Sequence, residues 1–218
     1  MTPNREDYLK LILELGGDTQ KINNKQIVAG LAVSAASVSE MLTKLVKENL
    51  VAHTPYQGVQ LTSSGLQRAS SLVRKHRLWE VFLEEKLHYT FNDVHEEAEV
   101  LEHVTSDQLA NRLEKFLDFP TACPHGGIIP KFQENLHEQK RKTIVDFPVG
   151  TTIRIARVLD EKDLLDYLVG LNVSLNDVYT IAELQADEGP VTLANDHKKI
   201  YLRHKTASTI FVEPVEQV

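Results

Sequence analysis

The 218-residue sequence has few of the features of exported or membrane proteins. A single cysteine, Cys123, excludes an internal disulfide and is typical of a reducing cytoplasm. No apolar run reaches the ~18 residues needed to cross a bilayer, and the polar first residues lack a secretory core. Aromatic residues make up only 6%, but the 42% hydrophobic and 25% charged fractions are typical of a globular chain. We therefore expect a cytoplasmic protein without a membrane partner.

Basic residues are also scarce, since 24 Lys and Arg face 31 Asp and Glu, for a net charge of -7. The total alone argues against binding to nucleic acid. However, residues 1–75 contain nine basic and six acidic residues, whereas the remainder contains 15 and 25, together with eight of the nine histidines. The uneven distribution predicts a mildly basic N-terminal region attached to an acidic, histidine-rich body.

The pattern of apolar residues and turn signals predicts a helical first half and a β-rich end. The expected helices are a stripe from Tyr8 to Leu15, 24–31, one capped by Ser34, one from Ser63 or Ser64 to about Leu87, 93–103 and 107–117. A hairpin is expected over 50–61, an irregular segment over 120–130, and a charged linker over 134–142. Strands are expected at 152–158, 178–184, 199–202 and 209–212, which together suggest a small β-barrel.

The order of the first elements is that of a winged helix-turn-helix. The outward face of the helix that follows Ser34 begins with small, hydroxyl-bearing residues, which would let it enter a major groove and contact phosphates or base edges. An ordinary amphipathic helix with a solvated face is the alternative, and the following hairpin favours DNA binding. The expected wing tip contains no Lys or Arg, so we expect weak phosphate contacts there. The candidate DNA-binding residues are Ser34, Ala36, Ser37, Ser39, Glu40, Thr43 and Lys44.

Carboxylates and imidazoles recur at helical spacing in the middle of the chain. His95, Glu99, Glu102 and His103 are expected on one helical face, and His76 and Glu80 form another pair four residues apart. Such a grouping is typical of a divalent-metal site, although a hydrated acidic face is the alternative for Glu102 and His103 alone. The recurrence of the pairs within one helical region favours metal binding.

A third candidate is Cys123-Pro124-His125, in which a thiolate and an imidazole lie two residues apart. This pair can chelate a soft or borderline ion, but it is not a zinc-finger signature because there is no second cysteine pair. A catalytic pair of Cys123 and His125 remains the less favoured alternative. The sequence contains no P-loop, nucleophile elbow or zinc-protease motif, so we expect no enzyme and no small-molecule substrate.

Taken together, several segments resemble the diphtheria toxin repressor family, and in particular its manganese-responsive members of the SloR and ScaR type. The likeness is dense over about residues 1–140 and weaker beyond. The segments are Tyr8-Leu-Lys-Leu-Ile-Leu-Glu-Leu, Val33-Ser-Ala-Ala-Ser-Val-Ser-Glu, Leu61-Thr-Ser-Ser-Gly, Arg74-Lys-His-Arg-Leu-Trp-Glu, Val94-His-Glu-Glu-Ala-Glu-Val-Leu-Glu-His and Cys123-Pro-His-Gly.

The resemblance implies a mainly α fold with β structure, in three parts. These are a winged helix-turn-helix domain over 1–72, a helical dimerisation and metal-binding domain with a linker over 73–142, and an SH3-like FeoA-type small β-barrel over 143–218. It further implies a homodimer that binds double-stranded, palindromic operator DNA when metal is bound, and that represses genes for metal uptake.

The metal ligands follow from the same resemblance. A primary site would use Asp7, Glu99, Glu102 and His103, and a secondary site would use Glu80, Cys123, His125 and Asp160, with His76 and His95 as further candidates. Iron-responsive relatives have methionine and cysteine where this chain has Asp7 and Glu99, and these oxygen donors favour Mn²⁺. Fe²⁺, Zn²⁺ or Cd²⁺ could still bind in vitro. The alternatives are an iron- or zinc-responsive regulator, a metal-buffering or protein-interaction module and a metal-dependent enzyme.

Overall fold

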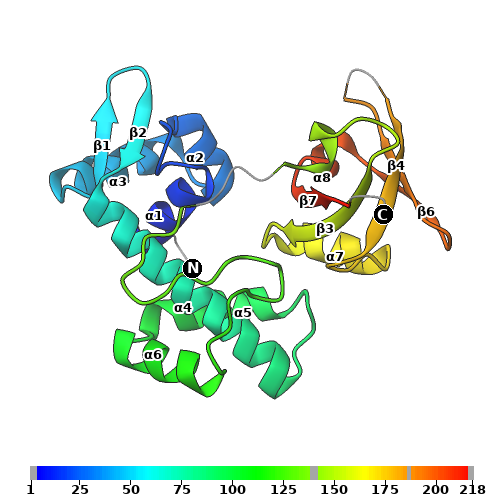
Figure 1. The fold of residues 1–218 in the computed structure, drawn as a ribbon. Coiled ribbons are helices and arrows are strands. Elements are labelled where there is room, and N and C mark those ends of the chain that lie inside the picture. Colours follow the sequence, from blue (N-terminus) through cyan, green and yellow to red (C-terminus); the bar gives the residue numbers. More distant parts are fainter. Residues whose placement is uncertain (1–3, 138–141, 186–187, 216–218) are drawn as a thin grey trace. The chain divides into compact units, whose positions relative to one another are not determined.

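The computed structural model describes residues 4–137, 142–185 and 188–215, which divide into two compact units (Figure 1). The described residues of the first unit are 4–79, 99–121 and 129–137. Those of the second unit are 80–98, 122–128 and the residues from 142 onward. Each unit has its own buried apolar cluster.

The first unit begins with three helices, α1 (Arg5–Glu14), α2 (Asn24–Leu31) and α3 (Ala35–Lys47). Ala32, in the left-handed conformation, ends α2, and α3 follows at a bend of 112°, as in helix-turn-helix motifs. The Ser34 hydroxyl accepts a hydrogen bond from the backbone N–H of Ser37 at 3.1 Å, which confirms the predicted N-cap. Val38, Leu42 and Leu45 bury the opposite face of α3 in the core.

The predicted hairpin consists of β1 (Val51–Thr54) and β2 (Gly58–Leu61), paired antiparallel from Val51–Leu61 to Thr54–Gly58. Gly58 has φ +113°, and a Cβ at this position would lie 2.2 Å from the carbonyl oxygen of Ile22. Only glycine lets the hairpin approach the segment before α2 this closely. The hairpin is therefore fixed beside the helix-turn-helix.

Three further helices are α4 (Ser63–Leu87), α5 (Val94–Val104) and α6 (Asp107–Phe116). Their bounds agree with the predicted ones to within one residue, because long apolar periodicity and the serine caps are strong local signals. Helices α4 and α5 contribute residues to both units. Part of the predicted charged linker, residues 138–141, lies outside the described residues.

The second unit contains a five-stranded antiparallel sheet in the order β6-β5-β4-β3-β7. Its strands are β3 (Thr152–Val158), β4 (Val178–Leu184), β5 (Val191–Ala194), β6 (Lys199–Leu202) and β7 (Ile210–Pro214). The short helices are η1 (Ile144–Asp146), α7 (Lys162–Gly170) and α8 (His204–Ala207). The sequence-based prediction omitted β5 and these short helices.

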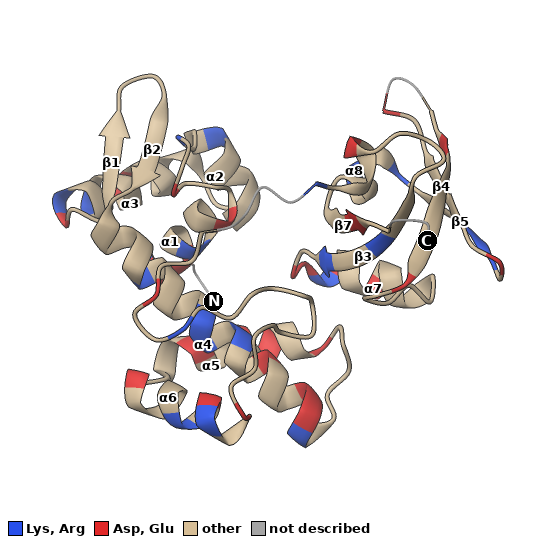
Figure 2. Cartoon of the chain, in the orientation of Figure 1, with Lys and Arg blue, Asp and Glu red and all other residues tan. Residues whose placement is uncertain are grey.

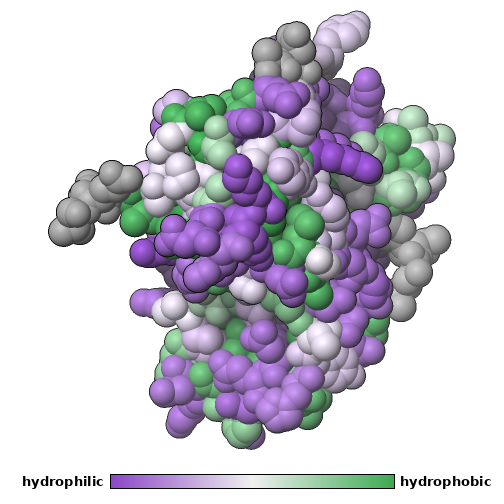
Figure 3. All heavy atoms as spheres, turned by 90° about the vertical axis from the view of Figure 1, so that its right-hand side faces the viewer, coloured by the Kyte–Doolittle hydropathy of each residue, from purple (hydrophilic) through white to green (hydrophobic). Residues whose placement is uncertain are grey.

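Among the described residues no single helix is long and apolar enough to cross a membrane; α2 and α3 reach that length and apolarity only together, across their bend. On the face drawn in Figure 3, hydrophobic residues are interspersed with hydrophilic ones.

Candidate metal centres and DNA interface

The first candidate metal centre begins at the N-terminus of α1. Asn4 caps this helix by accepting a hydrogen bond from the backbone N–H of Glu6 at 2.6 Å, and Asp7 accepts one from the backbone N–H of Asn4 at 2.5 Å. One carboxylate oxygen of Asp7, Oδ2, is thereby fixed to the cap. The other, Oδ1, points to Nε2 of His103 on α5, 2.9 Å away.

His103 lies between two acidic residues of α1. Its Nδ1 is 2.8 Å from Oε2 of Glu6, while its Nε2 faces Asp7 and lies 3.5 Å from Oε1 of Glu102. Partial burial lowers the pKa of His103, but Glu6, Glu102 and Asp7 outweigh this effect and hold it above its ordinary value. Partial burial raises the pKa of Asp7, although the bond from Asn4 and the nearby His103 act in the opposite direction. Asp7, Glu102 and His103 form a group whose potential ligand atoms all lie within 4.8 Å of one another.

Glu102 is the most enclosed member, because none of its side chain is exposed. Oε2 of Glu102 accepts a hydrogen bond from Nδ1 of His76 at 2.6 Å and one from Nζ of Lys10 at 3.0 Å. Burial would raise the pKa of Glu102, but His76 and Lys10 outweigh this effect and lower it, so the carboxylate is ionised. Neither the Lys10 contact nor the Glu6 contact was predicted from the sequence.

Glu99 is placed differently from the other predicted primary ligands. It is about half exposed, and its Oε1 is 3.2 Å from Nζ of Lys10. It lies with His76 and Glu102 in a second group of potential ligand atoms within 4.8 Å of one another. The structure therefore brings Asp7, Glu102 and His103 together and places Glu99 on the Lys10 side of Glu102.

The second candidate centre lies in the other unit and is formed by Glu80, Cys123, His125 and Asp160. His125 is fully buried, and its Nδ1 lies 2.9 Å from Glu80 Oε1 and 3.0 Å from Asp160 Oδ1. Its Nε2 donates a hydrogen bond to the carbonyl oxygen of Phe91 at 2.7 Å. Burial would lower the pKa of His125, but Asp160, Cys123 and Glu80 raise it far above its ordinary value. These side chains come from α4, the 120–130 segment and the residues after β3.

Gly126 holds the segment that carries Cys123 and His125 against β3. It has φ +80°, and a Cβ there would lie 2.2 Å from the carbonyl oxygen of Ala156. The carbonyl oxygen of His125 accepts a hydrogen bond from the backbone N–H of Val158 at 3.1 Å. This close packing helps to bury the side chains of Cys123 and His125.

The two remaining candidates are His76 and His95, and each contacts a carboxylate described above. His76 contacts Glu102 and Lys10 in the first unit, as described above. Nδ1 of His95 lies 3.9 Å from Oε1 of Glu80 in the second unit. Their assignment to the secondary site stays a prediction.

All seven candidate DNA-binding residues are exposed on α3 or at its N-cap. The hydroxyl of Ser39 donates to the carbonyl oxygen of Ala35 at 2.9 Å, and that of Thr43 donates to the carbonyl oxygen of Ser39 at 2.8 Å. Each hydroxyl oxygen can still accept a bond from a ligand. Lys44 Nζ pairs with Glu40 across one turn at 2.7 Å. The exposed face of α3 thus offers donors and acceptors that the helix itself orients.

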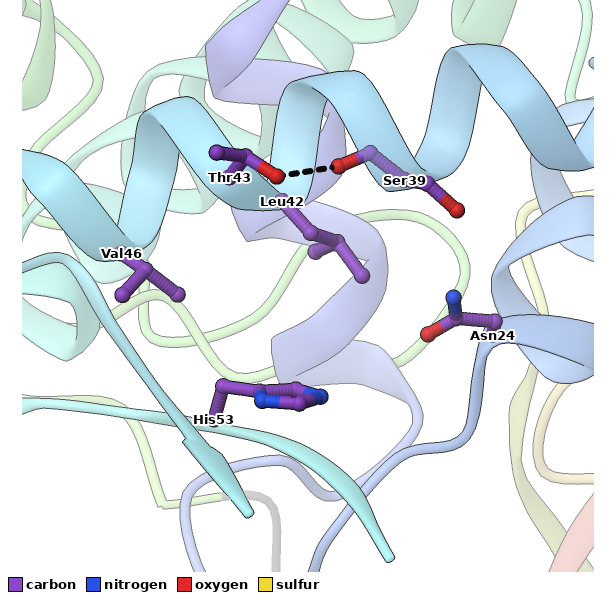
Figure 4. A pocket seen from close by; sticks show the side chains of 6 residues that line it. All are labelled: Asn24, Ser39, Leu42, Thr43, Val46 and His53. Atoms are coloured by element: carbon purple, nitrogen blue, oxygen red, sulfur yellow. Dashed lines mark hydrogen bonds between the residues drawn. The ribbon is translucent and has the colours of Figure 1, made fainter. Parts of the chain in front are cut away.

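A shallow pocket of about 300 Å³ lies beside this face, between α3, β1 and the start of α2 (Figure 4). Leu42 and Val46 are its apolar lining residues, and Ser39, Thr43, Asn24 and His53 are its polar ones. The hairpin itself contains no Lys, Arg, Asp or Glu, as its uniform tan colour in Figure 2 shows. A positive charge from outside the hairpin lies at its tip, because Nζ of Lys21 donates a hydrogen bond to Oε1 of Gln57 at 2.5 Å. Sequence analysis missed this cation because the two residues lie 36 positions apart.

Three family models match the chain in succession. Residues 1–59 match the iron dependent repressor, N-terminal DNA binding domain, and residues 62–131 match its metal binding and dimerisation domain. Residues 142–214 match the FeoA domain. Among solved structures, that of the manganese regulator SloR is 44% identical, with a TM-score of 0.88, over 99% of this chain and 100% of that one. This chain belongs to the diphtheria toxin repressor family.

Other members of the diphtheria toxin repressor family show the same full-length likeness. ScaR, solved with bound Zn²⁺, is 42% identical with a TM-score of 0.88, over 98% of this chain and 100% of that one. The diphtheria toxin repressor of Corynebacterium glutamicum is 27% identical over 97% of this chain and 96% of its own length. The chain is accordingly a metal-dependent transcriptional repressor and not an enzyme. Its three-part fold, with a DNA-binding domain, a helical domain and a FeoA domain, agrees with the predicted class.

Proposed function

We propose that this repressor is activated by Mn²⁺ and binds palindromic operator DNA as a homodimer to control genes for metal uptake. The group of Asp7, Glu102 and His103 carries the proposal, because it joins the first helix of the DNA-binding region to α5 through potential metal ligands. Two carboxylates and an imidazole suit Mn²⁺ better than a thiolate-containing site does. The likeness to the manganese regulator SloR supports the same choice.

The geometry explains how metal can control the position of α1. A bound divalent ion would supply positive charge where the carboxylates of Asp7 and Glu102 meet. His103 would coordinate the ion through Nε2, which in the metal-free protein contacts Asp7. Its Nδ1 would keep its contact with Glu6. Asp7 would then hold α1 to α5 more firmly than one hydrogen bond does. Because coupling is reciprocal, operator DNA would tighten metal binding by the same factor.

We propose that DNA contacts come from the exposed face of α3 and from the hairpin region. Ser34, Ala36, Ser37, Ser39, Glu40, Thr43 and Lys44 would enter the major groove from α3. Lys21 would contact a phosphate beside the hairpin, and His53 would extend the same surface from β1. A region with so few cations binds DNA weakly by charge alone, so two copies reading two half-sites would supply useful affinity.

We propose that the homodimer forms through exposed apolar side chains of α5 and α6. Val104 is 78% exposed and Phe116 is 65% exposed, and Val100 and Leu109 are exposed on the same two helices. Large apolar side chains left in water on neighbouring helices are typical of a protein–protein interface. The domain model that covers these helices describes metal binding and dimerisation.

We also propose that the domains end at residues 72 and 142, as the sequence predicted, and that the protein acts in the cytoplasm, where a repressor meets its promoters. Fe²⁺ or Zn²⁺ is the alternative signal. Relatives include iron-dependent repressors, and ScaR has been solved with Zn²⁺ and with Cd²⁺. The thiol of Cys123 gives the second centre a donor that suits these softer ions.

A binding titration with two isosteric variants tests the proposal. Asp7→Asn keeps the acceptor for the α1 cap, and Glu102→Gln keeps an acceptor for Lys10, so both should fold while losing a negative ligand. We expect each variant to lose Mn²⁺-dependent binding to a palindromic duplex selected from random DNA with the wild-type protein and Mn²⁺. Fluorescence anisotropy with Mn²⁺ and with a chelator measures the effect.

The matched control is Glu97→Gln, since Glu97 is an exposed carboxylate of the same helix α5. This variant should bind like the wild type. Undiminished Mn²⁺ dependence in Asp7→Asn and Glu102→Gln would refute the proposed centre. If the wild type responds only to Fe²⁺ or Zn²⁺, the protein is still a metal-dependent repressor, but its activating metal is not Mn²⁺.

A further inference from the structure

A fully exposed tyrosine lies at the tip of the β1–β2 hairpin. The exposed fraction of Tyr56 is 108%, and within the described part of the chain its side chain makes no hydrogen bond. The hairpin that carries it projects beyond the helices of the first unit (Figure 1). Exposed aromatic side chains are enriched where proteins contact other molecules. Packing within the protein therefore does not account for Tyr56.

The backbone of the hairpin tip is unfavourable for a tyrosine. The backbone N–H of Gln57 donates to the carbonyl oxygen of Thr54 at 3.1 Å, which makes Pro55 and Tyr56 the two central residues of a turn. Tyr56 has φ +63°. Proline followed by a residue with positive φ is the pattern of a type II turn, in which the second central residue is usually glycine or asparagine. A bulky residue is strained there, and such strain is typical of functional sites.

The hairpin tip is held in a fixed position beside the helix-turn-helix. Ile22 and Val59 exchange two backbone hydrogen bonds, of 2.7 Å and 2.9 Å, between the segment before α2 and strand β2. Next to them, Nζ of Lys21 donates to Oε1 of Gln57 at 2.5 Å. The strained side chain of Tyr56 is therefore presented by a well-anchored hairpin.

The hairpin leads from the exposed face of α3 toward its tip. His53 of β1 lines the shallow pocket together with Ser39 and Thr43 of α3. Tyr56 follows His53 by three residues, so the two Cα atoms lie within about 10 Å of each other. The major groove of DNA is about 12 Å wide. With α3 in that groove, the tip would reach the DNA strand at its edge, and the charge of Lys21 beside the tip favours DNA over a protein partner.

We propose that Tyr56 contacts the sugar–phosphate backbone of operator DNA at the edge of the groove that α3 enters. The phenol hydroxyl donates to a phosphate oxygen, as tyrosines do in protein–DNA complexes, and the ring lies against a deoxyribose. The inference rests on the proposed function and deepens it, because it names the contact made by a hairpin without Lys or Arg. Such a contact positions the protein on the duplex and does not read its sequence.

Operator binding by the full chain tests this contact. Tyr56→Gly and Tyr56→Ala both remove the ring, and we expect each to raise the Kd in saturating Mn²⁺ by about tenfold, the effect of losing one hydrogen bond to a charged group. The loss should be similar for all duplex sequences. The slope of log affinity against log salt should not change, because the phenol carries no positive charge and releases no counterion. Tyr56→Phe keeps the ring and should bind with intermediate affinity.

The matched control is Tyr201→Ala, because Tyr201 is a 65% exposed tyrosine of β6 in the second unit. This variant should bind operator DNA like the wild type. Fluorescence anisotropy with labelled duplexes measures all the affinities.

Urea unfolding separates a DNA contact from a role in the fold. Glycine accepts a positive φ without strain, so Tyr56→Gly should unfold at the wild-type urea concentration or a higher one. A tyrosine that supports the fold would instead make both Tyr56→Gly and Tyr56→Ala less stable, which would contradict the inference.

The contact and the proposed function fail in different ways. Wild-type affinity of Tyr56→Gly and Tyr56→Ala, or a loss confined to one operator sequence, would overturn the backbone contact and leave the proposed function intact. If the wild type binds no duplex in the presence of Mn²⁺, the proposed function is refuted and this contact with it.

Discussion

The two candidate metal centres both pair carboxylates with a cationic side chain, but the cations differ in kind. In the first unit the cation is Lys10, which cannot ligate a metal while it is charged. In the second unit it is His125, whose imidazole would be able to ligate a metal once its proton leaves. We therefore expect the first centre to keep its cation when metal binds and the second to exchange a proton for the metal.

The two centres also differ in donors and in exposure. Asp7 and His103 are partly exposed and carry oxygen and nitrogen donors, and Asp7 lies in the first turn of α1. Cys123 and His125 are buried in a segment fixed against β3. An accessible site suits a reversible signal, and an enclosed site with a thiol suits a structural ion. We therefore propose that the first centre senses metal and that the second stabilises its unit.

Replacing His125 should produce the largest effect on stability. His125→Ala leaves the buried Glu80 and the partly exposed Asp160 without their shared cation, which we expect to cost about 3 kcal/mol in the metal-free chain. Urea unfolding followed by far-ultraviolet circular dichroism measures the loss. The fluorescence of Trp79, the one tryptophan, reports on the first unit and should shift much less.

His197→Ala is the matched control, because His197 is exposed in the same unit and its side chain has no hydrogen bond that the structure describes. It should unfold at the wild-type urea concentration. An equal stability of His125→Ala and wild type would show that Glu80 and Asp160 do not depend on His125.

A cysteine substitution should separate the metal preferences of the two centres. Cys123→Ser replaces a soft sulfur donor with a hydroxyl, so we expect Zn²⁺ and Cd²⁺ affinity at the second centre to fall by about 100-fold. Mn²⁺-dependent operator binding should not change. Calorimetric titration with each metal checks the first point, and anisotropy with operator DNA checks the second.

Asp7→Asn provides the reciprocal test, since it should abolish the DNA response and spare Zn²⁺ binding at the second centre. If Cys123→Ser instead removes operator binding, the division between sensing and stability is wrong.

The orientation of His103 should have a smaller effect, which is expected on the affinity for Mn²⁺. Glu6→Ala removes the partner of Nδ1, and loss of such an outer hydrogen bond typically weakens metal binding by about tenfold. Glu6→Gln keeps an acceptor and should restore most of the affinity. Isothermal titration with Mn²⁺ distinguishes them, and an unchanged affinity for Glu6→Ala would show that Glu6 does not position His103.

Local signals in the sequence predicted the fold well where they were strong. The serine cap at Ser34 and the long apolar periodicity of α4 gave bounds that the structure confirms. The helix α7 was missed because Glu161 makes no side-chain cap there, and β5 was missed because it has only four residues. Short elements depend on tertiary packing, which periodicity does not record.

The site was less predictable for a similar reason. Glu102 and His103 are neighbours on one helix, so their chemistry is visible in the sequence. Lys10 and Glu102, however, are 92 residues apart, and nothing local in an amphipathic first helix shows that its lysine is buried. The assignment of Asp7 came only from family resemblance. Contacts between segments that are distant in the sequence determine which charged side chains of the site are paired, and such contacts are visible only in the structure.

The smallest expected effect concerns Lys21, and it tests whether DNA contacts belong to the first unit alone. Lys21→Gln removes a cation held beside the hairpin tip, so operator affinity should fall similarly for all sequences. The slope of log affinity against log salt should decrease by about one, as for a single phosphate contact. Lys205→Gln, an exposed lysine of the second unit, should leave the slope unchanged. A reduced slope for Lys205→Gln would extend the DNA interface into the second unit, and an unchanged slope for Lys21→Gln would exclude that lysine from it.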